Sequence, residues 1–378
     1  MERRWSRKLN AAPPSGVRYP EAPRFHQRGE GSHSHRKTSG SQVHHYGTAR
    51  AIAVIGELNV DLIASGLTSA PVVGGEVLAE DFQTVLGSAS AIFACGAARL
   101  GHPVSFFSKV GDDDYGRFCL DALKKAGIST ENVATVPTSK TGVTISLSMR
   151  SDRALVTMLG AISELRYKDL DVQALRGHSH LHMTSFFLQT NLRPSFPRIL
   201  RQARKLGLTT SFDPNSDPMS SWGHDVWRVI DETTIFFINQ EEALHLTRKK
   251  NVREALKQLA ERAPCVVVKL GPRGAIAAAD GQVVSAPPFK VSPVDTTGAG
   301  DSFAAGFVHA FLSGGDLHGC LVEGNACGAL STLKVGGTAG QPDLKTLEKF
   351  LRRNGMEKEI HKHHVTSDLA PTIRIARS

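Results

Sequence analysis

The sequence predicts an α/β fold: a three-layer α/β/α sandwich with a mainly parallel central sheet and a small β-sheet lid. Continuous apolar runs such as 51–55 are typical of strands that are buried on both faces. Most of these runs are separated by helical stretches, which implies crossover connections, parallel neighbours and helices on both faces of the sheet. Two regions, within about 62–86 and 137–160, contain short strands without intervening helices. We expect these strands to form the lid against the α/β body.

The predicted elements follow one another in a regular order after residue 50. Strands are predicted at 51–55, 103–111, 141–149, 153–160, 179–187, 208–215, 233–240 and 265–271. Helices are predicted at 114–127, 193–207 and 251–263, and another begins near Ser302. Gly127 provides the stop signal of the first of these helices, because glycine is favoured just after a helix end.

Polar residues and glycines follow five of the predicted strands. They are Asn59 and Asp61, Asp213 and Asn215, Asn239 and Glu242, Gly271, and Asp295. Ligands of open α/β sheets bind at the carboxyl ends of the strands. Ordinary turn chemistry accounts for single cases, such as the Asp-Pro-Asn turn at Asp213, but five such strand ends indicate a binding site.

The N-terminal 48 residues differ from the rest of the chain. They are rich in Arg, Ser, Gly, Pro and His, and they carry nine Arg or Lys against three Glu, a net +6 of the chain's +9. Such a composition buries too little surface to offset chain entropy, so we predict a disordered basic tail over 1–48. A nucleic-acid-binding arm is the alternative for this tail alone, and plain solvation is favoured over it. One folded domain is expected over 49–352, followed by a C-terminal tail over 353–378.

Bulk properties exclude several classes of protein. The chain is 40% hydrophobic and 21% charged, which is ordinary for a soluble globular protein. No apolar run reaches the roughly 18–20 residues that span a bilayer, and the charged N-terminus lacks the apolar region of a secretory signal. The five cysteines are scattered and never spaced as Cys-x-x-Cys, which favours reduced thiols in a core. We therefore expect a cytoplasmic protein without a membrane segment.

The stretch VDTTGAGDSFAAGF, residues 294–307, carries the strongest chemical signal. Gly298, Ala299 and Gly300 allow close backbone approach just before an apolar helical pattern. The first turn of that helix has unpaired N–H groups and a partial positive charge, which suits a phosphate. Asp301 would repel such an anion, so its position makes sense as a base that accepts a hydroxyl proton.

An ordinary helix cap is the alternative for this stretch, with Asp301 as the N-cap residue after a glycine turn. The stretch is not a Walker A loop, because no Lys-Ser/Thr pair follows the glycines.

The segment DTTGAGDSFAAGF closely resembles the signature of the ribokinase-like (PfkB-type) carbohydrate and nucleoside kinases. The resemblance covers about residues 50–352, and further segments fall in the family's order: GELNVDLI, GSASAIFACGAARLG, KVGDDDYG, INQEE and VKLGPRG. It implies a ribokinase-like fold and an ATP-dependent transfer of phosphate to a sugar or nucleoside.

The resemblance also implies roles for single residues. Asn59, Asp61 and Gly87 match positions that meet the substrate. Asn239 and Glu242 match the family's N-x-x-E element, which helps to place Mg²⁺ and phosphate, in keeping with the oxygen ligands that a hard cation prefers. A helix cap with an acidic first turn is the structural alternative for this pair.

The remaining implied positions belong to the nucleotide and to a monovalent cation. Lys269, Gly271 and Gly274 match the nucleotide-contacting turn, and Asn325 lies in a segment that usually flanks the adenine. Asp295 and Thr297 match positions that often bind a monovalent cation such as K⁺ beside the anion hole.

Two positions depart from the family pattern. Where the family usually has a second glycine and an asparagine that contacts sugar, this chain has Ser88 and Ile92. An isoleucine side chain forms no hydrogen bond, so that substrate contact is absent or supplied elsewhere. A bulkier or less hydroxylated substrate than ribose would fit this change.

The sequence thus predicts an ATP- and Mg²⁺-dependent kinase of a small sugar, with Asp301 as base and the GAGD helix start as anion hole. A nucleoside kinase on the same scaffold is the nearest alternative. A non-catalytic relative that senses sugar or binds nucleic acid is disfavoured by the retained GAGD and N-x-x-E elements. The exposed edges of the lid strands suggest a homodimer.

Overall fold

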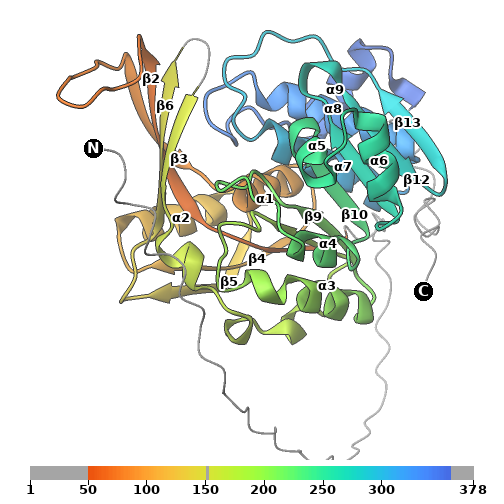
Figure 1. The fold of residues 1–378 in the computed structure, drawn as a ribbon, viewed down its shortest axis with the longest axis horizontal. Helices are drawn as coiled ribbons and strands as arrows, with labels where there is room; N and C mark the ends of the chain where they lie inside the picture. The colour runs from red at the N-terminus through yellow and green to blue at the C-terminus, as the bar shows by residue number, and fades with distance from the viewer. Residues whose placement is uncertain (1–49, 150–152, 359–378) are drawn as a thin grey trace, which may run out of the picture. The chain divides into compact units, whose positions relative to one another are not determined.

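The large sheet of the protein, sheet A, is mainly parallel, as predicted. The computed structural model describes residues 50–149 and 153–358, so the predicted tail 1–48 and most of the predicted tail 353–378 lie outside the described residues. Within them, the strand order of sheet A is β13-β12-β11-β10-β9-β8-β1-β4-β5 (Figure 1). Neighbours from β5 to β11 are parallel, whereas β12 and β13 are added antiparallel. The bounds are β1 Ile52–Ile55, β4 Val104–Gly111, β5 Ser129–Val136, β8 His180–Thr184, β9 Thr209–Asp213, β10 Ile235–Asn239, β11 Cys265–Lys269, β12 Ala275–Ala279 and β13 Gln282–Ala286.

Helices cover both faces of sheet A because its strands are apolar on both sides. In β10, Ile235 and Phe237 pack into one hydrophobic cluster, and Phe236 and Ile238 pack into the other. The first cluster contains α1 Ala89–Arg99, α2 Asp114–Lys125, α7 Ala299–Leu312, α8 Leu317–Ser331 and α9 Leu344–Arg353. The second contains α3 Phe196–Lys205, α4 Asp225–Ile230, α5 Gln240–Thr247 and α6 Val252–Ala260. The predicted three-layer α/β/α arrangement is confirmed.

A second sheet, sheet B, is formed by the predicted lid strands. Its strands are β3 Asp81–Leu86, β2 Asn59–Leu67, β6 Gly142–Met149 and β7 Arg153–Met158, in this order (Figure 1). The strand β2 begins at Asn59, three residues earlier than predicted. Because side chains alternate along a strand, the pairing places Asp61, Thr144 and Thr157 in one row across the sheet.

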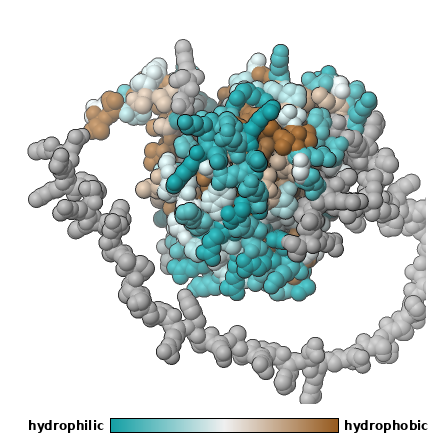
Figure 2. Space-filling view, turned by 45° about the vertical axis from the view of Figure 1, so that its right-hand side comes forward, coloured by the Kyte–Doolittle hydropathy of each residue, from teal (hydrophilic) through white to brown (hydrophobic). Residues whose placement is uncertain are grey.

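The opposite face of sheet B is apolar and partly exposed. The register places Phe82, Ile145, Val156 and Met158 on this face, and each of these side chains is exposed. Figure 2 shows that the viewed surface is mainly hydrophilic, with only small hydrophobic patches.

The predicted end of helix α2 and the predicted state of the cysteines agree with the structure. Gly127 follows α2 with φ of 77°, and all five cysteines are free and buried. Burial raises the pKa of Cys95, Cys119 and Cys265 to about 12, so these thiols are poor nucleophiles. Among the described residues, no helix is both long enough and apolar enough to cross a bilayer.

Candidate active site

The helix α7 begins on the predicted glycine motif. Its N-cap is Gly298, whose φ of 70° lies in the left-handed region that favours glycine. A Cβ there would also lie 2.9 Å from the Ile92 Cγ2 atom. No side chain caps this helix, and Asp301 lies inside its first turn. The alternative of Asp301 as an ordinary N-cap is therefore wrong.

Most amides at this helix start are available to a ligand. The amide of Ala299 donates to the Thr296 carbonyl at 3.3 Å. Within the described chain, the amides of Gly298, Gly300 and Asp301 make no hydrogen bond. Together with the helix dipole, these N–H groups form a site that suits an anion.

The carboxylate of Asp301 is half-buried at the same place and has an unusual pKa. Burial raises this pKa to about 7, with further raising by Asp213 and Glu57 and with lowering by Lys269 and a hydrogen bond from Asn215. A carboxylate with a pKa near neutrality suits a general base, because it accepts a proton readily while about half of it is still ionised at neutral pH.

Asn215 is held so that its amide nitrogen faces Asp301. Its Oδ1 accepts hydrogen bonds from the Ser185 amide at 3.0 Å and from the hydroxyls of Ser185 and Thr184. With the oxygen engaged by these three donors, the NH₂ group is the part that donates to the Asp301 carboxylate. Sequence reasoning left Asn215 between a turn role and a cleft role. In the structure its backbone amide donates to Asp213 Oδ1 at 3.3 Å, as in the turn, and its side chain lies beside Asp301.

Lys269 lies beside the helix start and among carboxylates. Its Nζ forms an ion pair with Asp213, and a Cβ built on Gly300 would lie 3.2 Å from that Nζ. Burial opposes the charge of Lys269, yet Asp213, Glu242 and Asp301 together raise its pKa. The lysine is therefore a buried cation next to the amides of α7.

Glu57 is a buried carboxylate that sequence reasoning did not assign to the site. It follows β1 and accepts hydrogen bonds from the Ser90 hydroxyl at 2.6 Å and the Ser185 hydroxyl at 2.7 Å. Burial raises its pKa, and its charge acts on both Asp61 and Asp301. The sequence signal that could have identified Glu57 is a charged residue two positions after a strand that is buried on both faces.

The predicted substrate residues Asn59, Asp61 and Gly87 lie together. The Asn59 amide donates to Asp61 Oδ1 at 3.0 Å, and a Cβ on Gly87 would lie 2.1 Å from the same oxygen. Only glycine leaves room for Asp61 in this position. Burial raises the pKa of Asp61 to about 6, and Arg153 lowers it.

Sheet B and the α7 loop meet through Arg153. Its Nη1 donates to Thr297 Oγ1 at 2.5 Å, and Thr297 in turn donates its amide and hydroxyl to Asp295 Oδ1 at 2.9 and 2.7 Å. The other oxygen of Asp295 accepts from the Gly336 amide at 2.8 Å. The predicted cation residues Asp295 and Thr297 are thus bonded to each other.

Asn239 and Glu242 form the helix cap that was the structural alternative. Asn239 Oδ1 accepts from the Glu242 amide at 2.9 Å, and Glu242 Oε2 accepts from the Asn239 amide at 3.0 Å. The other Glu242 oxygen faces the Ser216 hydroxyl, and burial raises the pKa of Glu242, as does Asp213. The cap thus fixes a carboxylate next to the Lys269 cluster.

The predicted nucleotide residues Gly274 and Asn325 meet at the end of β13. A Cβ on Gly274 would lie 2.2 Å from the Ala286 carbonyl oxygen. Asn325 donates to the same oxygen at 3.2 Å and to the Pro287 carbonyl at 3.0 Å. Gly271 lies in the turn between β11 and β12, with open space beside it.

The two departures from the family pattern have structural partners. Ser88 has φ of 74°, a value that favours glycine, and its hydroxyl donates to the Glu57 carbonyl at 2.6 Å and accepts from the Ala91 amide at 3.0 Å. Ile92 is buried against Gly298 and Gly337, each of which would clash with it if it carried a Cβ. Ile92 therefore supports the α7 loop.

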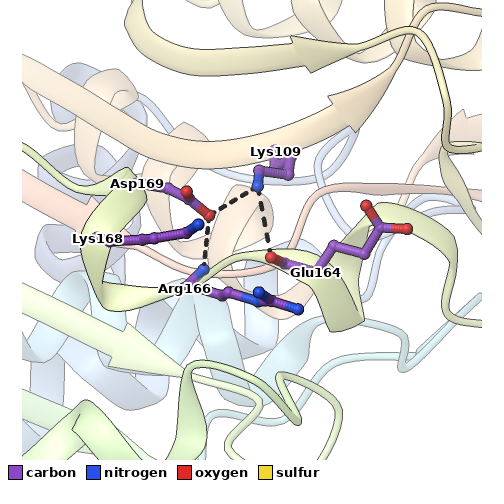
Figure 3. A pocket seen from close by; sticks show the side chains of 5 residues that line it. All are labelled: Lys109, Glu164, Arg166, Lys168 and Asp169. Atoms are coloured by element: carbon purple, nitrogen blue, oxygen red, sulfur yellow. Dashed lines mark hydrogen bonds and ion pairs between the residues drawn. The ribbon is translucent and has the colours of Figure 1, made fainter. Parts of the chain in front are cut away.

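A separate cavity of about 350 Å³ shares no residue with this site. It is lined by Lys109, Glu164, Arg166, Lys168 and Asp169 (Figure 3). Lys109 Nζ pairs with Asp169 at 2.7 Å and donates to the Glu164 carbonyl at 3.4 Å. The ion pair with Asp169 engages Lys109, which is the least exposed cation of this cavity. We therefore do not assign the cavity a part in phosphoryl transfer.

Comparisons with known proteins agree with the geometry. The pfkB family carbohydrate kinase profile matches residues 49–344. Ribokinase of Bacillus subtilis is 29% identical over 80% of this chain and 99% of its own length. An ATP-dependent ribose-1-phosphate kinase of Halopiger xanaduensis is 31% identical over 74% of this chain and 91% of its own. The crystal structure of a putative ribokinase II from E. coli in complex with ATP and Mg²⁺ superposes with a TM-score of 0.73 at 25% identity, covering 80% of this chain and 99% of that one. The chain therefore belongs to the PfkB family of carbohydrate kinases.

Proposed function

We propose that this sugar kinase uses Asp301 as the base that activates a sugar hydroxyl. The observation that carries the proposal is a carboxylate with a pKa of about 7 beside the open amides of α7. The hydroxyl proton passes to Asp301, the oxygen forms a bond to the γ-phosphorus of ATP, and the bond from that phosphorus to the bridging oxygen breaks to release ADP. The amides of Gly298, Gly300 and Asp301 bind the transferred group, and the Ala299 backbone shapes the turn.

The cofactor residues suit ATP and Mg²⁺. Glu242 and Asp213 are buried carboxylates, which are the ligand type that Mg²⁺ prefers, directly or through water. Asn239 fixes Glu242 through the cap. When bound, Mg²⁺ neutralises phosphate charge. Gly271, Gly274 and Asn325 form the wall proposed for the nucleotide, and Asp295 and Thr297 are the residues proposed for K⁺.

Substitution of Asp301 tests the mechanism. We expect Asp301→Asn to lower kcat by about 10²-fold or more, the usual contribution of a general base. Asp280→Asn, in the exposed turn between β12 and β13, is the matched control and should retain full activity. Turnover of ATP is measured against a panel of sugars and nucleosides. Near-normal kcat in Asp301→Asn would refute the role of the base.

A nucleoside kinase is the second candidate, because Ile92 removes a polar contact from the substrate side. Phosphorylation of adenosine or another nucleoside, without phosphorylation of any free sugar, would favour it. The same panel therefore separates the two activities.

A homodimer through sheet B is also proposed. The exposed apolar face that contains Phe82, Ile145, Val156 and Met158 is self-complementary in chemistry, and β7 is an open edge of the sheet.

A further inference from the structure

Arg153 brings a positive charge to the sugar end of the site. It lies at the start of β7 on the same face of sheet B as Asp61, Thr144 and Thr157. From there its long side chain reaches Thr297, in the loop that leads into the anion hole. The guanidinium also acts electrostatically on Asp61. It therefore lies between the proposed sugar-binding carboxylate and the phosphoryl-transfer loop.

Neutral hydroxyl groups also lie on this face of sheet B, where the register places Ser146 and Ser148 with Arg153. The Ile92 side chain packs under Gly298 and cannot form a hydrogen bond. The hydroxyls of Thr144 and Thr157 contact each other at 3.1 Å, and Thr144 also accepts from Asn59 at 3.4 Å. Arg153 is exposed, so a ligand can reach it. A guanidinium presents its N–H donors in a fixed fork that matches a carboxylate or a phosphate.

We propose that Arg153 is a specificity residue that binds an anionic group of the substrate, so that the substrate is a small sugar carrying a carboxylate or a phosphate. This inference rests on the proposed function. Arg153 reaches this point from sheet B, and Thr297, to which it donates, lies four residues before Asp301.

The test compares matched neutral and anionic sugars. The full-length protein is assayed with Mg-ATP on glucose and gluconate, fructose and fructose 6-phosphate, and ribose and ribose 5-phosphate. For at least one pair, we expect kcat/KM to be about 10- to 100-fold higher for the anionic member. The sugar-acid arm and the sugar-phosphate arm identify which anionic group is bound.

Substitution of Arg153 separates recognition from a structural role. Arg153→Met should lower kcat/KM for the anionic member of a pair more than for its neutral partner, through KM, and Arg153→Lys should keep part of this preference. Arg117→Met, on exposed α2, is the control. The inference is overturned if neutral members are preferred in every pair, or if Arg153→Met weakens neutral and anionic sugars alike, as a simple contact with Thr297 would.

A binding measurement without turnover distinguishes the anion subsite at Arg153 from the proposed phosphoryl transfer by Asp301. Calorimetric titration with gluconate and with the sugar phosphates measures affinity in the absence of ATP. If no anionic sugar binds more tightly than its neutral partner, the inference fails, even where Asp301→Asn abolishes transfer to a neutral sugar and the proposed function stands. If an anionic sugar binds through Arg153 but no member of the panel is phosphorylated, the proposed function fails and the anion subsite stands.

Discussion

At the scale of single residues, the site depends on how neighbouring groups set the protonation of Asp301. Burial raises its pKa to about 7, while the Lys269 charge and the Asn215 hydrogen bond favour the ionised form. Asn215 can do so because its oxygen is already engaged by Thr184 and Ser185. The base is therefore tuned by residues from β8, from β11 and from the chain that directly follows β8 and β9.

Replacing Asn215 with glycine tests this tuning. Glycine tolerates the φ of 54° at this position, so the change removes the side chain without backbone strain. Loss of a hydrogen bond to the carboxylate raises the pKa of Asp301 further, so a smaller fraction is ionised at neutral pH. In Asn215→Gly we expect the acid limb of the kcat/KM profile to move to higher pH, with a loss of about tenfold near pH 6.5 that shrinks by pH 8.5. A loss of equal size at every pH would contradict this role.

At the scale of elements, sheet B has two faces with different chemistry. The face with Asp61 and Thr144 is mainly polar, although it includes Leu155, and it contacts the α7 loop through Arg153, whereas the opposite face is mainly apolar. The alternation follows from the two-residue period of a strand, which separates the two sets by register alone. One sheet can therefore serve a ligand on one side and a second copy of the chain on the other.

The dimer proposal is tested on the apolar face. Ile145 and Val156 are paired across β6 and β7, and they are 39% and 59% exposed. Introducing like charges with the double change Ile145→Glu and Val156→Glu should convert a dimer to a monomer, because like charges opposite each other repel. The mass in solution is measured by light scattering after gel filtration. Val283→Glu, on exposed β13, should leave the mass unchanged; a wild-type mass of one chain would exclude the dimer.

At the scale of the whole molecule, buried histidines connect stability to pH. His180 and His182 share the Ser211 hydroxyl at 2.7 Å each, and His182 stacks on Phe93 with ring centroids 3.6 Å apart. Burial lowers the pKa of both, to about 3 for His180. Below the ordinary imidazole pKa, these histidines are therefore protonated in the unfolded chain and neutral in the folded chain. The contribution of the two histidines to stability is full above about pH 6.5 and falls as the pH decreases toward 3.

His182→Gln isolates this effect. Glutamine does not titrate, so the free energy of unfolding should fall less steeply between pH 6 and 4.5, by about 1.4 kcal/mol per pH unit relative to wild type. The variant should also be less stable at pH 7, because the stack on Phe93 is lost. Urea denaturation at a series of pH values measures the slope. Carboxylates with raised pKa values change the stability in the opposite direction as the pH falls, but they are present in both wild type and variant. Equal slopes of unfolding free energy against pH in wild type and His182→Gln would rule out a neutral buried His182.

Much of the fold and the motif chemistry follows from sequence, because these features are local. Continuous apolar runs such as 51–55, and Gly127 after a helical pattern, depend on near neighbours, and the structure contains the corresponding strands and helix end. The position of Asp301 beside Gly298 and Gly300 is likewise a matter of adjacent residues. The choice between N-cap and first-turn residue was not local, since it depended on where α7 begins.

The α/β layering, the mainly parallel sheet and the helix start at GAGD could be predicted from local sequence patterns. The distant groups that surround this helix start are known only from the folded chain. Lys269 pairs with Asp213 across 56 residues, Arg153 meets Thr297 across 144, and Ile92 lies under Gly298. Such contacts depend on the order of strands in sheet A and on the register of sheet B, which no local pattern specifies. The physical reason is that helix and strand periodicity act over a few residues, whereas burial, ion pairing and pKa are set by all the groups that the folded chain brings together.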